Sequence, residues 1–354
     1  MGKEYKWKMA DGYAEKNGYK VFSCFACGGG STMGYKRAGF DVIGMNEIDP
    51  KMANAYITNH NPKHAFIEPI QSFKLREDLP DELFDLDILD GSPPCSSFSM
   101  AGNREKDWGK EKKFKEGQAE QVLDTLFFDF IDLAKRLKPK IVVSENVKGM
   151  LMGEAKQYVR EVYKQFDDAG YYTQHWLLNG ADMGLPQKRQ RVFFVSMRKD
   201  LANPFLIQKD MFTQVPKLDL EFKERWVTYG EFKTGDVGRA LTMSTLDLWH
   251  KKIKGDIDFG DINKRENDKE SRFGVKFIFD NETPKTLPAG DDAVPVKWDK
   301  PNRISDSEIA MMSSFPLDYD YRKNRANYIC GMSVPPLMIQ KIAEQIKIQW
   351  LDKL

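Results

Sequence analysis

Short apolar runs alternate with segments of helical periodicity over the first 198 residues, and this alternation constrains the fold more than any other feature of the chain. Buried strands are expected at 19–25, 41–47, 84–89, 141–143 and 192–197. Helices are expected at 31–38, 50–59, 119–137 and 154–169. Strands that alternate with helices favour an α/β fold with a parallel, doubly wound sheet.

The pattern changes after Met197. Residues 201–300 have weak periodicity and many dipeptides typical of loops, which predicts a separate, smaller and irregular domain. Helical periodicity returns at 306–314 and at 335–351. We therefore expect three segments, 1–198, 199–302 and 303–354, of which the first and the last belong to one domain.

The composition excludes several classes of protein. With 41% hydrophobic residues and a net charge of +1, from 54 Lys and Arg against 53 Asp and Glu, the chain is too apolar and too balanced to be disordered. Its 354 residues allow about two domains. No run approaches the roughly 18 apolar residues of a membrane span, and residues 1–20 lack the apolar core of a secretion signal. We expect a cytoplasmic protein that does not bind membranes.

The cysteines and histidines predict no metal site. The four cysteines, Cys24, Cys27, Cys95 and Cys330, are too few for a disulfide framework and favour a reducing compartment. No second C-x-x-C pair and no histidine cluster completes a zinc site. The four histidines, His60, His64, His175 and His250, show no ligand spacing and are interpreted as surface or satisfied core residues. The acidic run from Asp81 to Asp90 is interpreted as solvated.

The glycine run after the first strand is a candidate ligand loop. Ligands of doubly wound sheets bind outside the carboxyl ends of the strands, and Phe25-Ala26-Cys27-Gly28-Gly29-Gly30 lies at such an end. A plain tight turn is an equally good interpretation of the run alone. Glu47 ends the second strand about 20 residues later, where an acid can hold ribose hydroxyls. The pair indicates an adenosine-containing cofactor, but it does not distinguish nicotinamide from S-adenosylmethionine.

Three further segments could carry chemistry. Cys95 follows two prolines just beyond a strand, so it could be a nucleophile or, equally well, a structural cysteine. Glu145 follows the apolar run 141–143, where a partly desolvated carboxyl group is suited to proton donation, although a solvated or capping glutamate is favoured on position alone. If residues 187–191 begin a strand, Gln187, Arg189 and Arg191 share one face; a solvated basic edge is as good an interpretation.

In their order and spacing these segments resemble the DNA (cytosine-5)-methyltransferase family. The matching blocks are FACGGGSTMG (25–34), NEID (46–49), GSPPCSSFS (91–99), DTLFFDF (124–130), ENV (145–147), QKRQR (187–191), RISDSEIAMMSSFP (303–316) and GMSVPP (331–336). One block is weak support, whereas eight in order are highly specific. The resemblance implies a Rossmann-like, S-adenosylmethionine-dependent methyltransferase sheet in 1–198 and 303–354, with a target-recognition domain in 199–302.

The resemblance also implies a mechanism. Cys95 would add to carbon 6 of a cytosine that has been flipped out of the duplex, which makes carbon 5 able to attack a methyl sulfonium. Glu145 would hold ring nitrogen 3 and the exocyclic amine, and Arg191 would hold the carbonyl oxygen at position 2. Arg189 would order the site around Cys95 and Glu145. Residues 97–118 resemble the mobile catalytic loop.

The cofactor implied is S-adenosylmethionine, with S-adenosylhomocysteine as product and no metal. The residues implied to bind it are Phe25, Ala26, Gly28, Gly30, Glu47, Ile48, Glu68, Pro94, Leu126, Ser333 and Val334. Cys27, Ser96 and Met332 depart from the family's usual Gly, Gln and Asn, which affects the expected cofactor contacts but removes no catalytic group.

The expected function is sequence-specific methylation of double-stranded DNA by a monomer in a prokaryotic or phage-infected cell, with a possible cognate restriction endonuclease as partner. An RNA cytosine methyltransferase and a catalytically silent DNA-binding homologue are the alternatives; the Cys-Phe-Thr tripeptide of the tRNA-modifying members is absent. A Rossmann dehydrogenase would also fit the composition, but it gives Cys95 and Arg191 no role. Residues 103–115 hold six basic and three acidic residues, so positive charge gathers in the expected catalytic loop despite the neutral total.

Overall fold

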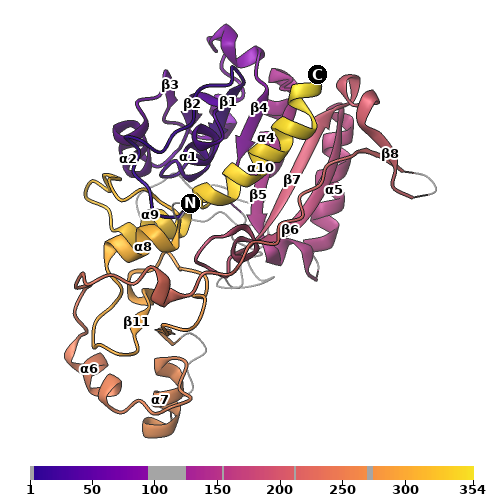
Figure 1. The fold of residues 1–354 in the computed structure, drawn as a ribbon. Helices are drawn as coiled ribbons and strands as arrows, with labels where there is room; N and C mark the ends of the chain where they lie inside the picture. The colour runs from indigo at the N-terminus through magenta and orange to yellow at the C-terminus, as the bar shows by residue number, and fades with distance from the viewer. Residues whose placement is uncertain (1–3, 95–124, 154, 211–212, 269–273) are drawn as a thin grey trace. The chain divides into compact units, whose positions relative to one another are not determined.

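The computed structural model describes residues 4–94, 125–153, 155–210, 213–268 and 274–354 (Figure 1). These residues form two compact units, each assembled from separate stretches of the chain. The sheet unit comprises Tyr13–Asn179, Gln190–Phe222 and Met338–Leu354, and the second unit comprises Met1–Gly12, Gly180–Arg189 and Lys223–Leu337. The unit boundaries do not coincide with those expected at 198 and 302, and the functions expected of the two domains stay predictions.

The sheet unit is built on a seven-stranded sheet with the order β3-β2-β1-β4-β5-β7-β6 (Figure 1). Its strands are β1 (Lys20–Cys24), β2 (Asp41–Asn46), β3 (His64–Phe66), β4 (Ile88–Gly91), β5 (Ile141–Val147), β6 (Tyr171–Asn179) and β7 (Gln190–Arg198). Neighbours from β3 to β5 are parallel, whereas β7 runs antiparallel to both β5 and β6. The predicted α/β class is confirmed. The sequence does not predict the edge strands β3 and β6 or the reversed direction of β7.

Helices and a hairpin complete the sheet unit. They are α1 (Gly30–Arg37), α2 (Pro50–His60), α3 (Ile70–Phe73), α4 (Leu126–Leu137), α5 (Ala155–Asp168) and most of α10 (Pro336–Gln349), with the hairpin β8 (Leu206–Gln208) and β9 (Gln214–Pro216). α2 begins where Asp49 caps the amide of Lys51, with Pro50 in its first turn, and it ends at Asn61 in the left-handed conformation. These are the start and stop signals that the sequence carries at this helix.

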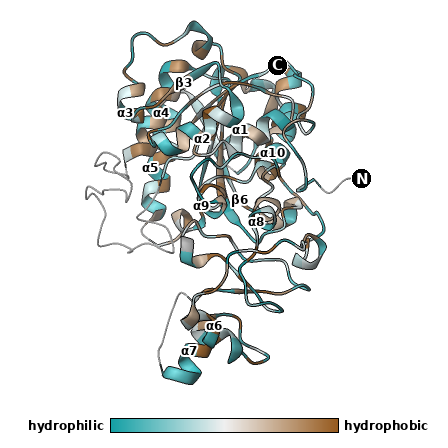
Figure 2. Ribbon diagram, turned by 90° about the vertical axis from the view of Figure 1, so that its left-hand side faces the viewer, coloured by the Kyte–Doolittle hydropathy of each residue, from teal (hydrophilic) through white to brown (hydrophobic). Residues whose placement is uncertain are grey.

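The core of the sheet unit lies between the sheet and helices α3, α4 and α5. α5 is amphipathic: Tyr158, Val159, Val162 and Phe166 are buried, whereas charged residues alternate with them along its turns (Figure 2). Phe127 of α4 meets the ring of Phe194 edge to face, with the ring centroids 5.6 Å apart. Because this packing fixes β4, β5 and β7 from one side, the residues at their carboxyl and amino ends have defined positions.

The second unit is less regular but contains more helix than the sequence predicts. Its elements are α6 (Met243–His250), α7 (Phe259–Asn267), α8 (Asp306–Met312), α9 (Ala326–Met332), β10 (Phe277–Ile278) and β11 (Val296–Lys297). Only α8 was expected, at 306–314. α6 and α7 share a small core with β10 and β11, in which Trp249 and Phe259 pack with Phe277 and Val296. The weak periodicity of residues 201–300 hides these short helices because each buries few residues.

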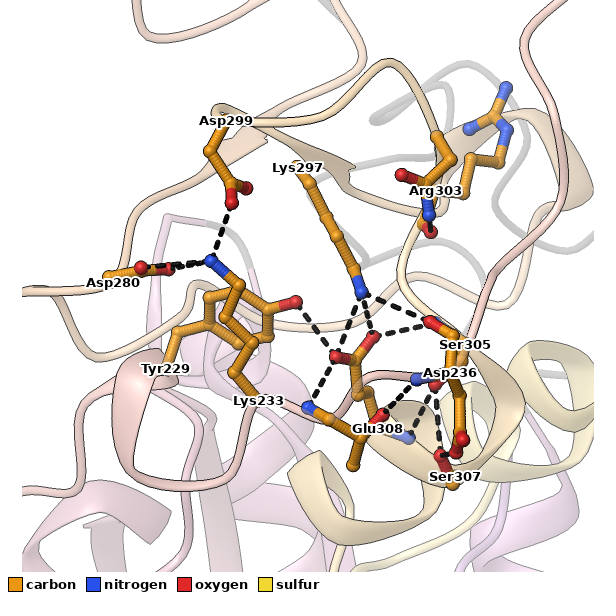
Figure 3. A network of polar contacts seen from close by, with 12 residues as sticks. Tyr229, Lys233, Asp236, Asp280, Lys297, Asp299, Arg303, Ser305, Ser307 and Glu308 are labelled. Carbon is orange, nitrogen blue, oxygen red and sulfur yellow. Dashed lines mark hydrogen bonds and ion pairs between the residues drawn. The ribbon is translucent and has the colours of Figure 1, made fainter.

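Glu308 of α8 is the centre of a buried polar network in the second unit (Figure 3). Its carboxylate is fully buried and pairs with Lys297, whose side chain is 2% exposed, at 2.9 Å. Four donors reach the two oxygens: the hydroxyl of Tyr229 at 3.0 Å, the amide of Thr234 at 2.9 Å, the amide of Ser305 at 2.8 Å and the ammonium group of Lys297. One side chain thus joins residues 229–234, β11 and the start of α8.

Among the described residues, no helix is both long enough and apolar enough to span a bilayer.

Candidate active site

The loop between β1 and α1 carries the glycine run, and its backbone turns sharply. Phe25, Cys27 and Gly29 have φ angles of 51°, 45° and 80°, in the left-handed region that side chains disfavour. The amide of Cys27 donates to Glu47 Oε2 at 2.8 Å, and the amide of Gly29 donates to the carbonyl of Ala26 at 2.8 Å. The chain therefore leaves the carboxyl end of β1 through a tight loop and enters α1, which is the strand-loop-helix arrangement that the sequence predicts.

Glu47 is buried at the same edge of the sheet, directly after β2. Its Oε1 accepts the amide of Asp49 at 2.8 Å and its Oε2 accepts the amide of Cys27. Burial raises the pKa of Glu47, and the backbone donors of Asp49 and Cys27 oppose that rise. Because each carboxylate oxygen has two lone pairs, the two amides fix its orientation and leave acceptor capacity for ligand hydroxyls.

A half-buried ion pair joins the end of β5 to the start of β7. Arg191 Nε lies 2.7 Å from Glu145 Oε1, and the two side chains are 16% and 12% exposed. The antiparallel register brings them together, since Val147 lies opposite Arg191 and Glu145 lies opposite Phe193. β5 extends through Val147, four residues further than the apolar run predicts, so Glu145 lies within the strand. The pair is a desolvated carboxylate with a guanidinium in a fixed orientation.

The segment that leads to residue 95, residues 91–94, is held by strand β5. Gly91 is the last residue of β4 and lies opposite Ser144 of β5, and Asn146 Nδ2 donates to the carbonyl of Pro93 at 3.1 Å. Pro94 is half-buried. Cys95 and residues 96–118, which include Ser96 and the expected catalytic loop, lie outside the described residues. The role of Cys95 therefore stays a prediction, but the residues that lead to it are anchored beside Glu145.

The thiol of Cys27 lies close to the carboxylates of Glu47, Glu145 and Asp49. Burial raises its pKa well above the usual value, and the negative charges of Glu47, Glu145 and Asp49 raise it further. Since all three carboxylates act on one sulfur, the glycine loop, Glu47 and Glu145 lie in one neighbourhood at the carboxyl ends of the parallel strands. A thiol with a raised pKa is a poor nucleophile, so this cysteine does not compete for the role predicted for Cys95.

Asp90 is a buried acid of this neighbourhood that sequence reasoning misinterpreted as solvated. It is 3% exposed in β4, and it accepts hydrogen bonds from Ser23 Oγ at 2.9 Å and from the hydroxyl of Tyr35 at 3.3 Å. Burial raises its pKa to about 7, against the lowering effect of the Ser23, Tyr35 and Ser31 hydroxyls; the charge of Glu145 adds to the rise. The strand run 84–89 ends just before it, which was the signal available in the sequence.

The raised pKa of Asp90 predicts a pH-dependent stability. Between pH 4 and pH 7 the folded protein keeps a proton on Asp90 that the unfolded chain has lost, so this group makes the free energy of unfolding fall as the pH rises towards 7. The slope is at most about 1.4 kcal/mol per pH unit. Asp90→Asn removes the titration, so its stability relative to the wild type should increase from pH 5 to pH 8 in urea unfolding.

Asp85 provides the matched control for that measurement. Its side chain is 78% exposed, and the hydrogen bond from Lys20 lowers its pKa. It is ionised in both states above pH 5, so Asp85→Asn should shift stability equally at pH 5 and pH 8. A constant difference between Asp90→Asn and the wild type over this range would show that Asp90 does not titrate there.

Gln187 and Arg189 do not share a strand face with Arg191, because β7 begins only at Gln190. Both belong to the second unit and bond within it. Gln187 donates to the carbonyl of Met312 at 3.2 Å, and Arg189 donates to the carbonyls of Gly331 and Ser333 at 3.0 and 3.1 Å. Arg189 is 2% exposed. It orders the backbone around residues 331–333, and its expected effect on Glu145 stays a prediction.

The other residues predicted to bind a cofactor have varied surroundings. Glu68 pairs with Arg76 at 2.9 Å, so its carboxylate is already engaged. Leu126 is buried at the start of α4, Ala26 is buried, and Ile48 is half-buried. Ser333 and Val334 are buried in the second unit, whereas the glycine loop lies in the sheet unit. Met332 is 47% exposed. A common pocket for all of these residues stays a prediction.

No group of three or more His, Cys, Asp or Glu side chains within the described ranges could hold a metal ion. The described residues of the candidate site are carboxylates, a guanidinium and a glycine loop.

Comparison with known families gives one match over most of the chain. The family model described as C-5 cytosine-specific DNA methylase matches residues 19–348. The matched range contains both Glu47 and the Glu145–Arg191 pair, and it extends through most of α10.

Individual relatives and solved structures agree with that match. The Type II methyltransferase M.FnuDI of Fusobacterium nucleatum is 37% identical over 182 residues, which cover 51% of this chain and 48% of the relative. The match thus spans about half the length of that relative. M.MthTI of Methanothermobacter thermautotrophicus is 28% identical over 92% of this chain and 96% of its own. The structure of a Spodoptera frugiperda DNMT2 mutant has a TM-score of 0.61 at 17% identity, covering 94% and 99% of the two chains, and shares the fold.

Proposed function

Because the chain belongs to the family of C-5 cytosine-specific DNA methylases, we propose that it is a sequence-specific DNA cytosine-5 methyltransferase. The observation that carries the proposal is the half-buried Glu145–Arg191 pair. The next residue of β5, Asn146, holds the carbonyl of Pro93, which leads to Cys95. Carboxylate and guanidinium together match the polar edge of a cytosine, where the amine donates and the carbonyl oxygen accepts. Neither a dehydrogenase nor a silent scaffold needs this arrangement.

The sheet unit fits S-adenosylmethionine as the methyl donor. Glu47 is a buried carboxylate with spare acceptor capacity, as ribose hydroxyls require, and the glycine loop precedes the N-terminus of α1. Phe25, Ala26, Gly28, Gly30 and Ile48 would surround the same ligand. Ser333, Val334, Glu68, Pro94 and Leu126 would complete the pocket. When bound, S-adenosylmethionine supplies an activated methyl group, which the residues of the chain do not provide.

The reaction itself depends on three side chains. The Cys95 thiolate adds to carbon 6 of the flipped cytosine and makes carbon 5 nucleophilic. Glu145 holds ring nitrogen 3 and the exocyclic amine, while Arg191 keeps Glu145 in place and holds the carbonyl oxygen at position 2. Once carbon 5 has been methylated, it loses its proton and the bond from carbon 6 to Cys95 breaks, which restores the aromatic ring and frees the cysteine.

Methylation mapping tests the function directly. Plasmid DNA from cells that express the chain should carry 5-methylcytosine at one recurring sequence, read at base resolution. A parallel assay should offer duplex DNA and tRNA as competing methyl acceptors. Methyl transfer to tRNA alone would favour the RNA methyltransferase, and unmodified plasmid together with unmodified tRNA would favour a silent homologue. The recognised sequence would also indicate whether a cognate restriction endonuclease is to be sought.

DNA affinity should depend on the lysines of the expected catalytic loop. Changing Lys110, Lys112 and Lys113 to glutamine should weaken binding to a duplex and lower the slope of log affinity against log salt by up to roughly 3, if each lysine contacts one phosphate. Fluorescence anisotropy at 50, 100 and 200 mM salt measures both quantities. An unchanged affinity and slope in the triple variant would refute the contacts.

A further inference from the structure

His60 lies at the end of α2 and faces the glycine loop, although its sequence context gives no sign of a function. Its side chain is buried, and Nε2 lies 3.4 Å from the carbonyl oxygen of Gly28. A carbonyl oxygen can only accept a hydrogen bond, so this contact requires the tautomer that carries its proton on Nε2. The loop carbonyl is thus held from a helix that lies outside the loop.

A second residue of α2 reinforces the contact. Tyr56 lies one turn before His60, is fully buried, and meets the imidazole edge to face with ring centroids 4.7 Å apart. The Tyr56 hydroxyl lies 2.7 Å from Thr32 Oγ1 in the first turn of α1. Lys36 of α1 donates to the His60 carbonyl at 3.3 Å. The last turn of α2 therefore holds both the loop and the helix that follows it.

Gly29 shows how closely this pair approaches the loop. Its φ is 80°, and a Cβ at this position would lie 2.2 Å from His60 Nε2 and 3.1 Å from the Tyr56 ring. A side chain would collide with α2. This glycine is therefore required on the protein side of the loop, by His60 and Tyr56, and not only by a ligand on the other side.

The imidazole is neutral in its hydrogen-bonding role. Burial lowers the pKa of His60 to about 3, and the positive charge of Lys36 lowers it further, against the effect of the Gly28 carbonyl. At any ordinary assay pH the ring can therefore donate from one nitrogen without carrying a charge. The support that it gives to the loop should not change between pH 6 and pH 8.

We propose that His60 is a positioning residue for the methyl donor. It fixes the Gly28 carbonyl and, through it, the backbone of the loop that binds the cofactor. The inference rests on the proposed function, because it assumes that the loop binds S-adenosylmethionine. When the loop is already ordered, binding of the cofactor does not have to include the free-energy cost of ordering it. Loss of the His60 contact should therefore lower the affinity for the cofactor. His60 contacts the loop at Gly28, Tyr56 of its own helix and Lys36 of α1, so we expect the rate at saturating cofactor to be preserved.

Two substitutions of His60 distinguish the effect of its hydrogen bond from the effect of its side-chain volume. His60→Leu keeps an apolar side chain of similar size but cannot donate, whereas His60→Gln keeps a donor that can reach Gly28. Calorimetric titration with S-adenosylhomocysteine should give a Kd about tenfold higher for His60→Leu, the size expected from one lost buried hydrogen bond, and within about threefold of wild type for His60→Gln. The kcat for methyl transfer should stay within about twofold in both, with the loss confined to KM for S-adenosylmethionine.

His175→Gln is the matched control. His175 also contacts a tyrosine, with the Tyr163 hydroxyl 2.7 Å from Nδ1, but it lies on β6, away from the glycine loop. Its Kd should equal that of the wild type. Equal Kd values for His60→Leu and wild type would overturn the proposal, as would equal weakening by Leu and Gln, which would assign His60 a purely steric role.

Stoichiometry distinguishes misfolding from weakened binding. A His60→Leu sample that binds with native Kd but fewer sites per chain has lost folded protein, and this result would also overturn the proposal. If His60→Leu does not fold, Thr32→Val provides a second test, because it removes the hydrogen bond between Tyr56 and α1. This variant should raise Kd by a smaller factor and keep the native kcat. An unchanged Kd would refute the proposed support of the loop by α2. Failure of the wild type to bind S-adenosylhomocysteine would contradict the proposed function itself.

Discussion

Replacement of Cys95 with alanine is expected to abolish methyl transfer and to leave duplex binding intact. Alanine cannot add to carbon 6, and without that bond carbon 5 of cytosine is too weak a nucleophile to be methylated. We expect activity below the detection limit, a loss of at least about 10⁴-fold, the size seen when the nucleophile of a covalent mechanism is removed. Transfer of labelled methyl groups to a duplex that contains the mapped site measures the loss.

A covalent trap gives the same prediction a second readout. With 5-fluorocytosine in the target position, fluorine replaces the proton that must leave carbon 5, so the bond between carbon 6 and Cys95 should persist. The wild type should form a stable adduct only when S-adenosylmethionine is present. Cys95→Ala should form none, and Glu145→Gln should form it more slowly. Full turnover by Cys95→Ala would reject the mechanism.

Cys24→Ala is the control for loss of a thiol. Cys24 is buried in β1, and burial raises the pKa of its thiol well above the usual value. Such a thiol has no nucleophilic role. The variant should keep wild-type activity per folded molecule, although the small cavity will reduce its stability somewhat. Equal inactivation of both variants would mean that the loss reflects folding.

Glu308→Ala is expected to cost about 3–5 kcal/mol of unfolding free energy, which is the usual effect of removing one member of a buried ion pair. The substitution leaves the Lys297 charge buried without its partner, and it leaves the Tyr229 hydroxyl and the Thr234 amide without their acceptor. The effect is large because one carboxylate serves all of these groups. Urea unfolding followed by tryptophan fluorescence and by circular dichroism measures it.

The double variant Glu308→Leu with Lys297→Met tests the physical reason. If the cost of the single variant comes from the uncompensated charge, removal of both charges should recover most of the stability. Asp299→Ala, which removes an exposed partner of Lys233 in the same region, should cost less than about 1 kcal/mol. A loss of that small size in Glu308→Ala would show that the network contributes little.

The sequence predicts most of the parallel part of the sheet because β1, β2, β4 and β5 each carry an apolar run, whereas the three-residue edge strand β3 is too short to give such a signal. The glycine run, Glu47 and the helix caps of 50–60 follow from local chemistry. The pairing of Glu145 with Arg191 could not be predicted from a parallel arrangement, since it depends on the antiparallel register of β7 with β5. The two residues were identified separately, and only the fold joins them.

Other residues escaped prediction because their surroundings are made by distant segments. Asp90 stands at the end of an acidic run, and only its contacts with Ser23 of β1 and Tyr35 of α1 reveal that it is buried. His60 has no neighbouring ligand residues in sequence, and its partner Gly28 lies 32 positions earlier. Arg189 was expected on a strand face, but its partners at 331–333 come from the far end of the chain.

The division of the chain has a consequence for its synthesis. The polypeptide passes between the two units after Gly12, Asn179, Arg189, Phe222 and Leu337. Residues 338–354 supply buried side chains of the sheet unit, among them Ile339, Ile342 and Ile346, and they leave the ribosome after every segment of the second unit. The sheet unit therefore cannot complete its core until the second unit has been translated. No single cut in the gene yields either unit intact, so the two are expected to be inherited and exchanged together.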